Sequence, residues 1–462
     1  HSGWSSLALA GNGGMKGASQ IVVRKEKGAW VAEDRHSHAY ETPSLDAQQD
    51  VELIFAEEAG GSISWGARLS RNSCDEDDYS VEDVSRWMLW ALGGSHAFDF
   101  HTERGQFHAN LVSGPAPAPD LSGVREVDIR MPGASLEVSA GADASNPYVC
   151  GMFDLRELMP SEDLSAKHHI AKFAPYLDPA SEQYVHHMIL YGCSGDTEGF
   201  THGQMIGNCQ SMPTGCGSMM WPWAMGSEDF VLPTDVGMPI GEGRHWVALQ
   251  MHYYNPQRTP GVVDRSGVRL SLSNVPRAQD AGVFQINGGV RSTQREALPA
   301  GQSSVTLPTF VVPDTCTKQW EVESINVLGV VHHAHLLGKH LKIEVARDGA
   351  YAGVLRDEKR FDFSHQSLEQ PPMGQLRRGD QLTLTCTYDT SSKTTETPFG
   401  DFTHEEMCWS ALMYYPAQRF NNGIVLPTAG LGSGKRRTMC NGGADWNVIT
   451  FAPIALSRPA CQ

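Results

Sequence analysis

An even number of cysteines, ten in 462 residues, is the feature that most constrains how this chain folds. They are scattered along the sequence, and no two form a Cys-x-x-Cys pair. A dispersed, even set indicates disulfides formed in an oxidising compartment, because a zinc cluster or a redox-active dithiol needs closely spaced cysteines. Ten buried free thiols in a cytosolic enzyme are the alternative. We therefore expect a protein of the secretory route: secreted, in its lumen or at the extracellular surface.

The overall composition excludes several function classes. A net charge of −17 without a Lys/Arg-rich stripe argues against nucleic acid as a partner. No apolar run reaches the ~18 residues that span a bilayer, so we expect membrane contact only through segments outside this sequence. The chain opens at His1 with neither an initiator Met nor a charged-then-apolar leader. We therefore expect that it is a fragment or an ordered region of a longer protein.

Short β-branched and aromatic runs alternate with clusters of Gly, Pro, Asn and Asp, while long helical periodicities are scarce. Examples are QIVVRKEKGAWVAEDR, VALQMHYYNP, LTLTCTYDT and WNVITFAPIAL. Such runs are typical of antiparallel strands. The sequence therefore predicts an all-β protein built of β-sandwiches.

Two breaks in this pattern divide the chain. The stretch SGPAPAPDLSG at 113–123 is rich in Pro, Ala and Gly, has no periodicity and indicates a linker. A weaker break near 278–281 indicates two β units after the linker. The expected organisation is an N-terminal domain at 1–112, a linker at 113–124, and two further domains at 125–279 and 280–462.

Two sets of side chains have the donor chemistry of copper sites. The first comprises His186 and His187 in YVHHMILYGC and His252 in LQMHYYNP; the second comprises His333 and His335 in VHHAHLLGK and Met407 in HEEMCWSALMYYP. Neutral imidazole binds copper in both oxidation states, and a thioether favours Cu(I). An all-imidazole set beside a mixed set predicts two coppers with different functions.

Spacing supports the two sets unequally. The H-x-H spacing of His333 and His335 places both rings on one face of a strand. Adjacent His186 and His187 point to opposite faces of a regular strand, so a shared metal there requires a bulge, a twist or a strand end. Taken singly, each residue also fits a hydrogen-bonded core position, and the His pair at 168–169 is interpreted as structural.

Ten segments from about Arg125 to the C-terminus resemble, in the same order, the dopamine β-hydroxylase and tyramine β-monooxygenase family. They are YVHHMILYGC, FVLPTDVGMPIG, LQMHYYNP, DRSGVRL, DAGVFQI, HAHLLGK, ARDG, GDQLTLTCTYDT, EEMCWSALMYYP and FAPI. The chain is more distantly similar to the peptidylglycine α-hydroxylating monooxygenase. The resemblance implies an enzyme that uses two coppers, ascorbate and O2 to hydroxylate an activated C–H bond of a small organic substrate.

The same resemblance assigns roles to the two sets. It implies that His186, His187 and His252 hold an electron-transfer copper, the H site. It also implies that His333, His335 and Met407 are the catalytic ligands of the O2-activating copper, the M site. Gln250 lies two residues before His252 on the same strand face, so it is a candidate to orient that ligand. An ordinary polar residue on the strand face is an equal alternative for Gln250.

The resemblance also implies how all ten cysteines pair. The implied bridges are Cys74 with Cys461, Cys150 with Cys209, Cys193 with Cys216, Cys316 with Cys440, and Cys386 with Cys408. A sixth bridge of the dopamine β-hydroxylase pattern lacks both of its cysteines here, as the loss of a real disulfide requires. The bridge between Cys386 and Cys408 would tether the strand that carries Met407.

Substrate recognition departs from the amine-hydroxylating pattern. Phenethylamine-hydroxylating members have a Glu at the position of Gln250 and a Tyr at that of Ala411. The missing carboxylate weakens the case for a cationic amine, and Trp409 with Ala411 indicates a more apolar or differently shaped pocket.

One alternative function is a catalytically inactive, disulfide-stapled extracellular structural or binding relative. Another is a module whose N-terminal domain holds haem or a sugar.

The N-terminal stretch resembles a DOMON domain, the β-sandwich that precedes the catalytic core in dopamine β-hydroxylases. The segments that carry this resemblance are GWSSLALAGNGGMKGASQIVV, AEDRHSHAYETPSLDAQQDVELI and CDEDDYSVEDV. We expect the domain to lack its opening strands, so that its sheet is incomplete or is completed elsewhere, for example in a homo-oligomer. In haem-binding relatives a Met in a GGM-like turn and a late His ligate iron, which makes Met15 and His101 candidate haem ligands. We favour a haem-free sandwich in which both are packing or surface residues.

Overall fold

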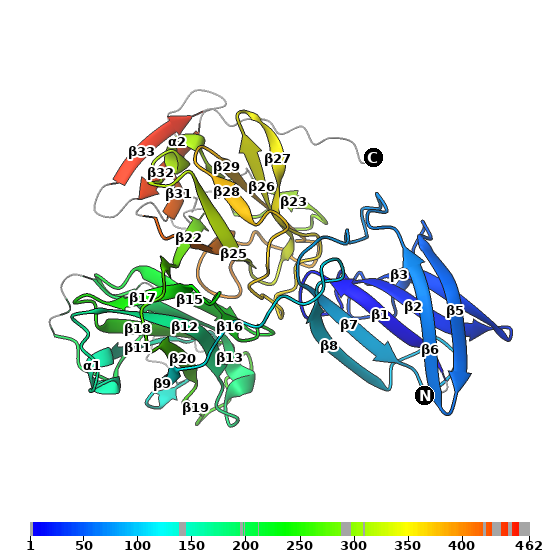
Figure 1. Cartoon of the computed structure of the whole chain (residues 1–462), viewed down its shortest axis with the longest axis horizontal. Coiled ribbons are helices and arrows are strands. Elements are labelled where there is room, and N and C mark those ends of the chain that lie inside the picture. Colours follow the sequence, from blue (N-terminus) through cyan, green and yellow to red (C-terminus); the bar gives the residue numbers. More distant parts are fainter. Residues whose placement is uncertain are drawn as a thin grey trace.

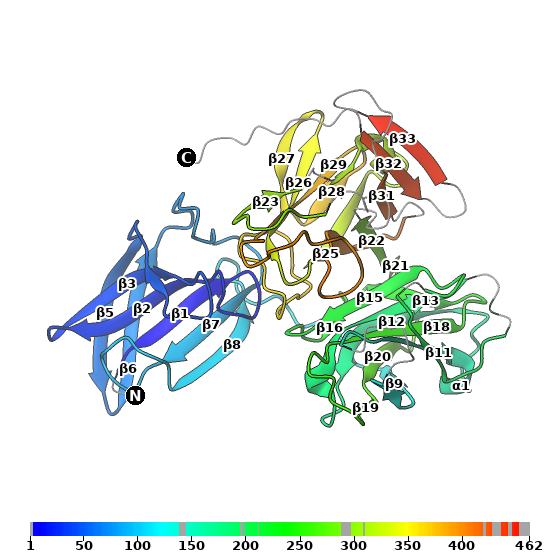
Figure 2. The same ribbon diagram turned by 180° about the vertical axis from the view of Figure 1, so that it is seen from behind.

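The structure is a computed structural model with three lobes (Figure 1), which are seen from behind in Figure 2. It describes residues 3–137, 145–194, 197, 199–210, 212–287, 297–307 and 310–418, and the strand backbones 422–426, 436–441 and 446–451. Helices in these residues are limited to single turns: α1 (Leu155–Leu158), η1 (Glu182–Tyr184) and α2 (Asp314–Thr317). The predicted all-β fold is confirmed.

The first lobe, blue in Figure 1, is a six-stranded antiparallel sheet with a separate hairpin. Its strands are β1 (Ser5–Ala10), β2 (Ser19–Glu26), β3 (Ala29–His36), β4 (Ser44–Leu45), β5 (Val51–Ala59), β6 (Ser62–Leu69), β7 (Arg86–Leu92) and β8 (Glu103–Ala109). The sheet order is β4-β3-β2-β1-β7-β8, and β5 pairs with β6. Lys27 and Gly28 both have positive φ, as the tight two-residue turn between β2 and β3 requires.

The second lobe, green in Figure 1, is a sandwich of two sheets. Its strands are β9 (Val124–Arg130), β10 (Ala134–Ser135), β11 (Tyr148–Asp154), β12 (Lys167–Tyr176), β13 (Val185–Gly192), β14 (Gln204–Gly207), β15 (Ser218–Ala224), β16 (Phe230–Val231), β17 (Val236–Gly241), β18 (Trp246–Tyr253), β19 (Val263–Asp264), β20 (Gly267–Ser273) and β21 (Gln279–Asp280). One sheet has the order β14-β11-β18-β13-β15 and the other β21-β17-β12-β20-β9. Phe173 and Trp221 stack between the sheets at 5.5 Å, and burying each ring contributes roughly 2 kcal/mol.

The third lobe, yellow to red in Figure 1, is also a two-sheet sandwich. Its strands are β22 (Gly282–Asn287), β23 (Val305–Thr306), β24 (Phe310–Val312), β25 (Ser324–His333), β26 (Gly338–Arg347), β27 (Ala350–Glu358), β28 (Gln375–Arg377), β29 (Gln381–Tyr388), β30 (Trp409–Tyr415), β31 (Asn422–Leu426), β32 (Arg436–Asn441) and β33 (Trp446–Phe451). The orders are β28-β25-β30-β22-β31-β32-β33 and β23-β29-β26-β27.

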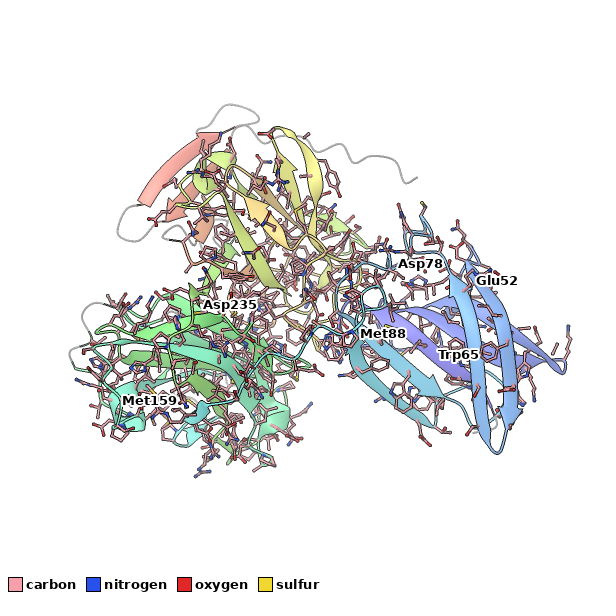
Figure 3. All side chains as sticks on the ribbon, viewed as in Figure 1. Glu52, Trp65, Asp78, Met88, Met159 and Asp235 are labelled. Carbon is pink, nitrogen blue, oxygen red and sulfur yellow. A yellow bond between two sulfur atoms is a disulfide. The ribbon has the colours of Figure 1, made fainter. Side chains whose placement is uncertain are left out.

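The lobes meet through different chemistry. The apolar core of the second lobe continues into the third through Val331, Ala411 and Met413. The first lobe meets the third through buried polar contacts, among them Trp87, whose indole N–H donates to Glu369 at 2.7 Å. Met88, labelled in Figure 3, lies where the first lobe turns toward the other two. Within the residues that the structure describes, the second and third lobes therefore share a continuous apolar interior.

The boundaries between lobes follow changes of sheet. Residues 110–123 contain no strand or helix, and they connect β8 of the first lobe to β9 of the second. Strand β21 pairs with β17 of the second lobe, whereas β22 pairs with β30 of the third. The predicted domain limits stay predictions at the level of single residues. Among the described residues, no helix is long and apolar enough to cross a membrane.

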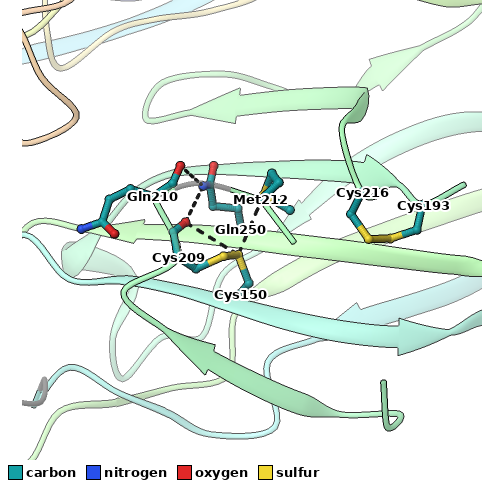
Figure 4. Close-up of a disulfide and its surroundings, with 7 residues drawn as sticks. All are labelled: Cys150, Cys193, Cys209, Gln210, Met212, Cys216 and Gln250. Atoms are coloured by element: carbon teal, nitrogen blue, oxygen red, sulfur yellow. Dashed lines mark hydrogen bonds between the residues drawn. A yellow bond between two sulfur atoms is a disulfide. The ribbon is translucent and has the colours of Figure 1, made fainter. Parts of the chain in front are cut away.

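Three of the implied disulfides are formed in the described residues. They join Cys150 to Cys209, Cys193 to Cys216, and Cys386 to Cys408; the first two are drawn in Figure 4. Cys74 and Cys316 are also disulfide-bonded. Their implied partners, Cys461 and Cys440, have side chains outside the described residues, so those two pairings stay predictions.

Two disulfides that close loops of similar length allow a matched stability experiment. Replacing Cys386 and Cys408 together by Ser removes a bridge across 22 residues, and the free energy of unfolding should fall by about 3 kcal/mol because the unfolded chain gains freedom. The matched control replaces Cys193 and Cys216, which close a span of 23 residues. Urea unfolding should show similar losses for both variants. Hydrogen exchange near Met407 should rise only in the first variant, and equal exchange in both would contradict a tether at Met407.

Candidate functional site

The first histidine set lies on two neighbouring strands of the second lobe. His186 and His187 follow Val185, the first residue of β13. His252 lies near the end of β18, directly opposite His187 in the antiparallel register. The register shifts between Val185 and His187, so His186 is the extra residue of a β-bulge. The bulge turns His186 toward the same side as His187. Of the three arrangements that would let adjacent histidines share a metal, namely a bulge, a twist or a strand end, the structure has the bulge.

The three rings of this set converge. His187 Nδ1 lies 3.0 Å from His186 Nδ1 and 3.4 Å from His252 Nδ1. All three side chains are buried, and His186 Nε2 and His252 Nε2 have no hydrogen-bond partner among the described residues. Rings that face only one another cannot all satisfy their nitrogens. A metal ion that accepts a lone pair from each ring fits this cluster.

Burial keeps these imidazoles unprotonated. It lowers the pKa of His186 to about 3, with His333 contributing further repulsion. It holds the pKa values of His187 and His252 well below the usual range, and the neighbouring rings act in the same direction. A neutral ring keeps the lone pair that a metal requires.

The second set lies at the strand ends of the third lobe that face the second lobe. His333 is the last residue of β25, and Met407 lies two residues before β30. We expected His333 and His335 on one face of a strand, but β25 ends at His333 and His335 lies in the following loop. Their rings are nonetheless 5.2 Å apart between centroids. The loop, rather than the strand pleat, positions His335.

Hydrogen bonds fix which nitrogen of each ring in this set is free. His333 Nδ1–H donates to Gln366 Oε1 at 2.6 Å, and the Gln366 amide is oriented by donating to Phe363 O at 2.8 Å. His335 Nδ1–H donates to Glu405 O at 3.0 Å. The Nε2 atom of each ring is therefore the lone-pair donor, and that of His335 is buried without a partner among the described residues. Burial lowers the pKa of His333 to about 4.

The two sets meet across the boundary between the second and third lobes. The rings of His187 and His333 are 5.4 Å apart between centroids, and Phe363 of the third lobe stacks on His186 at 4.2 Å. Tyr148 of the second lobe stacks on His252 at 4.0 Å and donates through its hydroxyl to Asp401 O of the third lobe. The boundary itself thus forms the site.

A cavity of about 220 Å³ opens between the two sets. His187, His333 and Met407 line it, together with apolar, aromatic and amide side chains and the carboxylate of Asp401. Trp409 lines this cavity as predicted for the pocket, whereas Ala411 lies in the apolar core that joins the two lobes. Met407 and His333 therefore share one chamber.

Gln250 lines the same cavity, and its hydrogen bonds go to the backbone (Figure 4). Its amide donates to Cys209 O at 2.7 Å and to Gln210 O at 3.3 Å. These bonds anchor the Cys209 segment against β18. A role of Gln250 in orienting His252 stays a prediction.

A buried carboxylate holds the loop of the second set, and nothing in the sequence singled it out. Glu406 Oε2 accepts N–H bonds from His335 at 3.0 Å and from Met407 at 3.2 Å, and Oε1 accepts from Leu337 at 2.6 Å. The side chain is fully buried. Burial raises the pKa of Glu406 to about 7, although the three backbone donors oppose this shift. Glu406 thus joins the loop of His335 to the segment of Met407.

Residues 361–369, which we call the bridging segment, contact all three lobes. Within it, Asp362 accepts a hydrogen bond from Tyr40 of the first lobe and Phe363 stacks on His186 of the second. Gln366 holds His333 of the third lobe, and Glu369 accepts from Trp87 of the first. Sequence reasoning missed Gln366 because it lies 33 residues from its histidine. No spacing rule connects the two positions.

The remaining sequence candidates lie elsewhere. Met15 and His101 line one cavity of about 760 Å³ in the first lobe, so the structure brings them to a common chamber. Haem binding there stays a prediction. In the 168–169 pair, His169 is buried, bonds Asp280 at 2.8 Å and accepts the Arg277 N–H. This second pair is structural, as interpreted.

Two family models match the chain. One is "Copper type II ascorbate-dependent monooxygenase, N-terminal domain" over residues 135–260, and the other is the corresponding C-terminal domain over residues 279–424. Together they cover more than half of the chain, and their limits enclose both histidine sets and Met407.

Curated relatives match over most of the chain. DBH-like monooxygenase protein 1 of Gallus gallus is 28% identical over 90% of this chain and 68% of its own length. Tyramine beta-hydroxylase of Caenorhabditis briggsae is 31% identical over 76% of this chain and 61% of its own length. Dopamine beta-hydroxylase of Equus caballus is 27% identical over 89% of this chain and 67% of its own length. A solved triple jelly roll of an archaeal virus aligns over 88% of this chain and 90% of its own, with 8% identity and a TM-score of 0.17, which supports no conclusion about the fold.

Glu406→Gln tests the carboxylate that holds the second set. The amide N–H₂ cannot accept the backbone donors that the carboxylate serves, so the free energy of unfolding should fall by about 1–3 kcal/mol. Because the folded-state pKa of about 7 exceeds the ordinary 4.5, the Glu406 contribution is complete at low pH and is lost as pH rises through about 7. Chemical denaturation should therefore show a larger difference between wild type and variant near pH 5 than near pH 8.

Glu405→Gln is the matched control, because its carboxylate accepts one backbone bond, from Phe402 N–H, which a Gln oxygen can keep. Its stability should stay within about 0.5 kcal/mol of wild type. Equal losses for the two variants would show that Glu406 has no special part in holding the loop.

Proposed function

We propose, from the premise that this chain belongs to the copper type II ascorbate-dependent monooxygenase family, that it hydroxylates an activated C–H bond of a small organic substrate. Copper and ascorbate are the cofactors of the family. O2 is the co-substrate that such a hydroxylation consumes. The activity of this chain is our proposal, because its relatives share about a third of their residues or fewer with it.

The observation that carries the proposal is the meeting of two donor sets at one cavity. In our assignment His186, His187 and His252 hold one copper, and His333, His335 and Met407 hold the other. The converging Nδ1 atoms of the first set, the unpartnered Nε2 atom of His335 in the second, and the low pKa values of His186 and His333 support this assignment. A thioether in the second set alone suits the ion that must remain Cu(I) to react with O2.

Bound copper supplies one-electron transfer and O2 activation, and the chain supplies the surroundings. Gln366 and Glu405 hold His333 and His335 with Nε2 free, so neither ring must change tautomer to act as a ligand. Phe363 and Tyr148 brace rings of the first set by stacking.

We propose a small substrate with an aryl-alkyl or similarly apolar body. The cavity of about 220 Å³ is lined by Trp223, Trp409 and Met219 among others, which favours apolar contact. Gln250 stands where amine-hydroxylating relatives have a Glu, but Asp401 contributes a carboxylate to the same lining. A cationic phenethylamine and a neutral aryl-alkyl compound therefore both belong in a substrate screen.

A catalytically inactive, disulfide-stapled extracellular protein is the alternative function. The disulfides suit it equally well, and they also support our proposal that the protein works in the secretory lumen or outside the cell. Metal content separates the two functions, because a scaffold has no need of copper.

Copper stoichiometry tests the assignment of the two sets. After copper loading and dialysis, elemental analysis should find two copper ions per chain in the wild type. His333→Ala should retain one, because the three ligands of the first set are unchanged. His169→Ala, which removes a structural histidine, should retain two. A wild type that binds one copper or none would exclude the two-copper enzyme.

Met407→His tests the oxygen-activating site. Imidazole is a harder donor than the thioether, so copper should stay bound while its balance between Cu(I) and Cu(II) shifts away from O2 activation. Turnover should fall at least about tenfold, and copper content should change little. An exposed methionine of the second lobe, Met205, provides the control: Met205→Leu should keep both copper and activity.

Ascorbate-dependent O2 consumption with phenethylamines, neutral aryl-alkyl compounds and glycine-extended peptides is the assay. Hydroxylated product must appear with the O2 consumed. Full activity of Met407→His on a responding substrate would remove Met407 from the ligand set. A copper-loaded wild type that hydroxylates no member of the panel would overturn the proposed substrate class.

A further inference from the structure

A second type of metal-ligand cluster lies in the first lobe, away from the cavity between the second and third lobes. It consists of His36 at the end of β3, His38 two residues later, and Asp77. Each offers one ligand atom, and the three atoms lie within 4.8 Å of one another. The spacing repeats the H-x-H pattern of His333 and His335, and sequence reasoning passed over it.

His36 is the observation that points to a ligand. Its side chain is 2% exposed, and neither ring nitrogen has a hydrogen-bond partner among the described residues. His36 Nε2 lies 3.7 Å from Asp77 Oδ1, longer than a hydrogen bond. A tetrahedral ion with ligand bonds of about 2.0–2.1 Å holds its donors roughly 3.3 Å apart. The gap between His36 and Asp77 is therefore close to that of two ligands on one ion.

The backbone around the cluster is already fixed. Ser37, between the two histidines, is fully buried; its N–H donates to Ala18 O at 3.1 Å and its carbonyl accepts the Gly17 N–H at 2.6 Å. On the other side, the Lys359 ammonium donates to the carbonyls of Glu76 and Asp78, which flank Asp77. Asp78 is labelled in Figure 3 at the end of the first lobe that faces the third. The exposed His38 is free to close the remaining distance.

The local charge favours a cation over an anion. Arg360 donates to Asp77 Oδ1 at 2.8 Å and places one positive charge beside the cluster. Against it stand the carboxylate of Asp77 and those of Asp46 and Asp75 nearby. Burial raises the pKa of Asp46, and the negative charges of Asp75 and Asp77 act in the same direction. Two imidazoles and one carboxylate are the donors of a borderline divalent ion such as Zn²⁺.

We propose that His36, His38 and Asp77 form a third metal site, for a divalent transition metal of the Zn²⁺ class. The site differs from both copper sets in having a carboxylate ligand, and from the second set also in having no thioether. It ties the end of β3 to the 75–78 segment, beside the ion pair of Arg360 with Asp77 that joins the first lobe to the third. The inference does not rest on the monooxygenase activity.

Zn²⁺ titration of the copper-loaded full-length protein tests the proposal. Calorimetry should detect one Zn²⁺ per chain, with copper content unchanged in the same samples. His38→Ala should weaken this binding more than about tenfold, because loss of a ligand costs at least as much as loss of an orienting partner. Since His38 is exposed, this variant should fold. His36→Gln should have the same effect if it folds.

Two controls separate this site from the copper sets. His101→Ala changes another histidine of the first lobe and should bind Zn²⁺ as the wild type does. His186→Ala should lose copper and keep the Zn²⁺ site. No binding by the wild type, equal binding by His38→Ala, or Zn²⁺ uptake matched by copper release would each overturn the proposal.

Discussion

Burial of unprotonated imidazoles at the boundary between two lobes is the constraint on which the site depends. Each buried polar atom without a partner costs about 1–3 kcal/mol. The unpartnered Nε2 atoms of His186, His252 and His335 therefore cost roughly 3–9 kcal/mol together, against a total stability of about 5–15 kcal/mol for a domain. Ligation through His335 Nε2 would offset its share of this cost, whereas the first set converges on its Nδ1 atoms, so packing must offset the cost of its Nε2 atoms. The apolar contact through Val331 and Met413, which continues the core of one lobe into the next, supplies part of the opposing stability.

The two histidine sets are built by different means although both lie at strand ends. In the first, a bulge at His186 brings neighbouring residues to one side, and the antiparallel register supplies His252. In the second, a loop carries His335, and the Glu406 carboxylate fixes that loop to Met407 through backbone donors. The first set is thus as rigid as its sheet. The geometry of the second depends on a few hydrogen bonds, to the Glu406 carboxyl group, the Gln366 side chain and the Glu405 carbonyl.

The sequence predicted those features that are determined by residues close together in the chain, and it missed those that are determined by tertiary contacts. The all-β fold and the donor types followed from strand patterns and side-chain chemistry. The need for a bulge near His186 followed from the two-residue period of a strand, although the pattern left twist and strand end open as alternatives. The H-x-H rule placed His335 near His333 but for the wrong reason, since the strand ends between them. Gln366 and Glu406 were missed because their roles arise from tertiary contacts that no spacing in the sequence encodes.

The bridging segment contacts all three lobes at once. Its Gln366 fixes the tautomer of His333, while the neighbouring His365 lines the large cavity of the first lobe. Thermodynamic linkage is reciprocal. A molecule in that cavity alters metal affinity at His333 only where it moves Gln366 along with His365, and metal at His333 then alters the affinity of that molecule by the same factor. The bridging segment is therefore the shortest stretch of chain through which occupancy of the first lobe could be coupled to the metal centre.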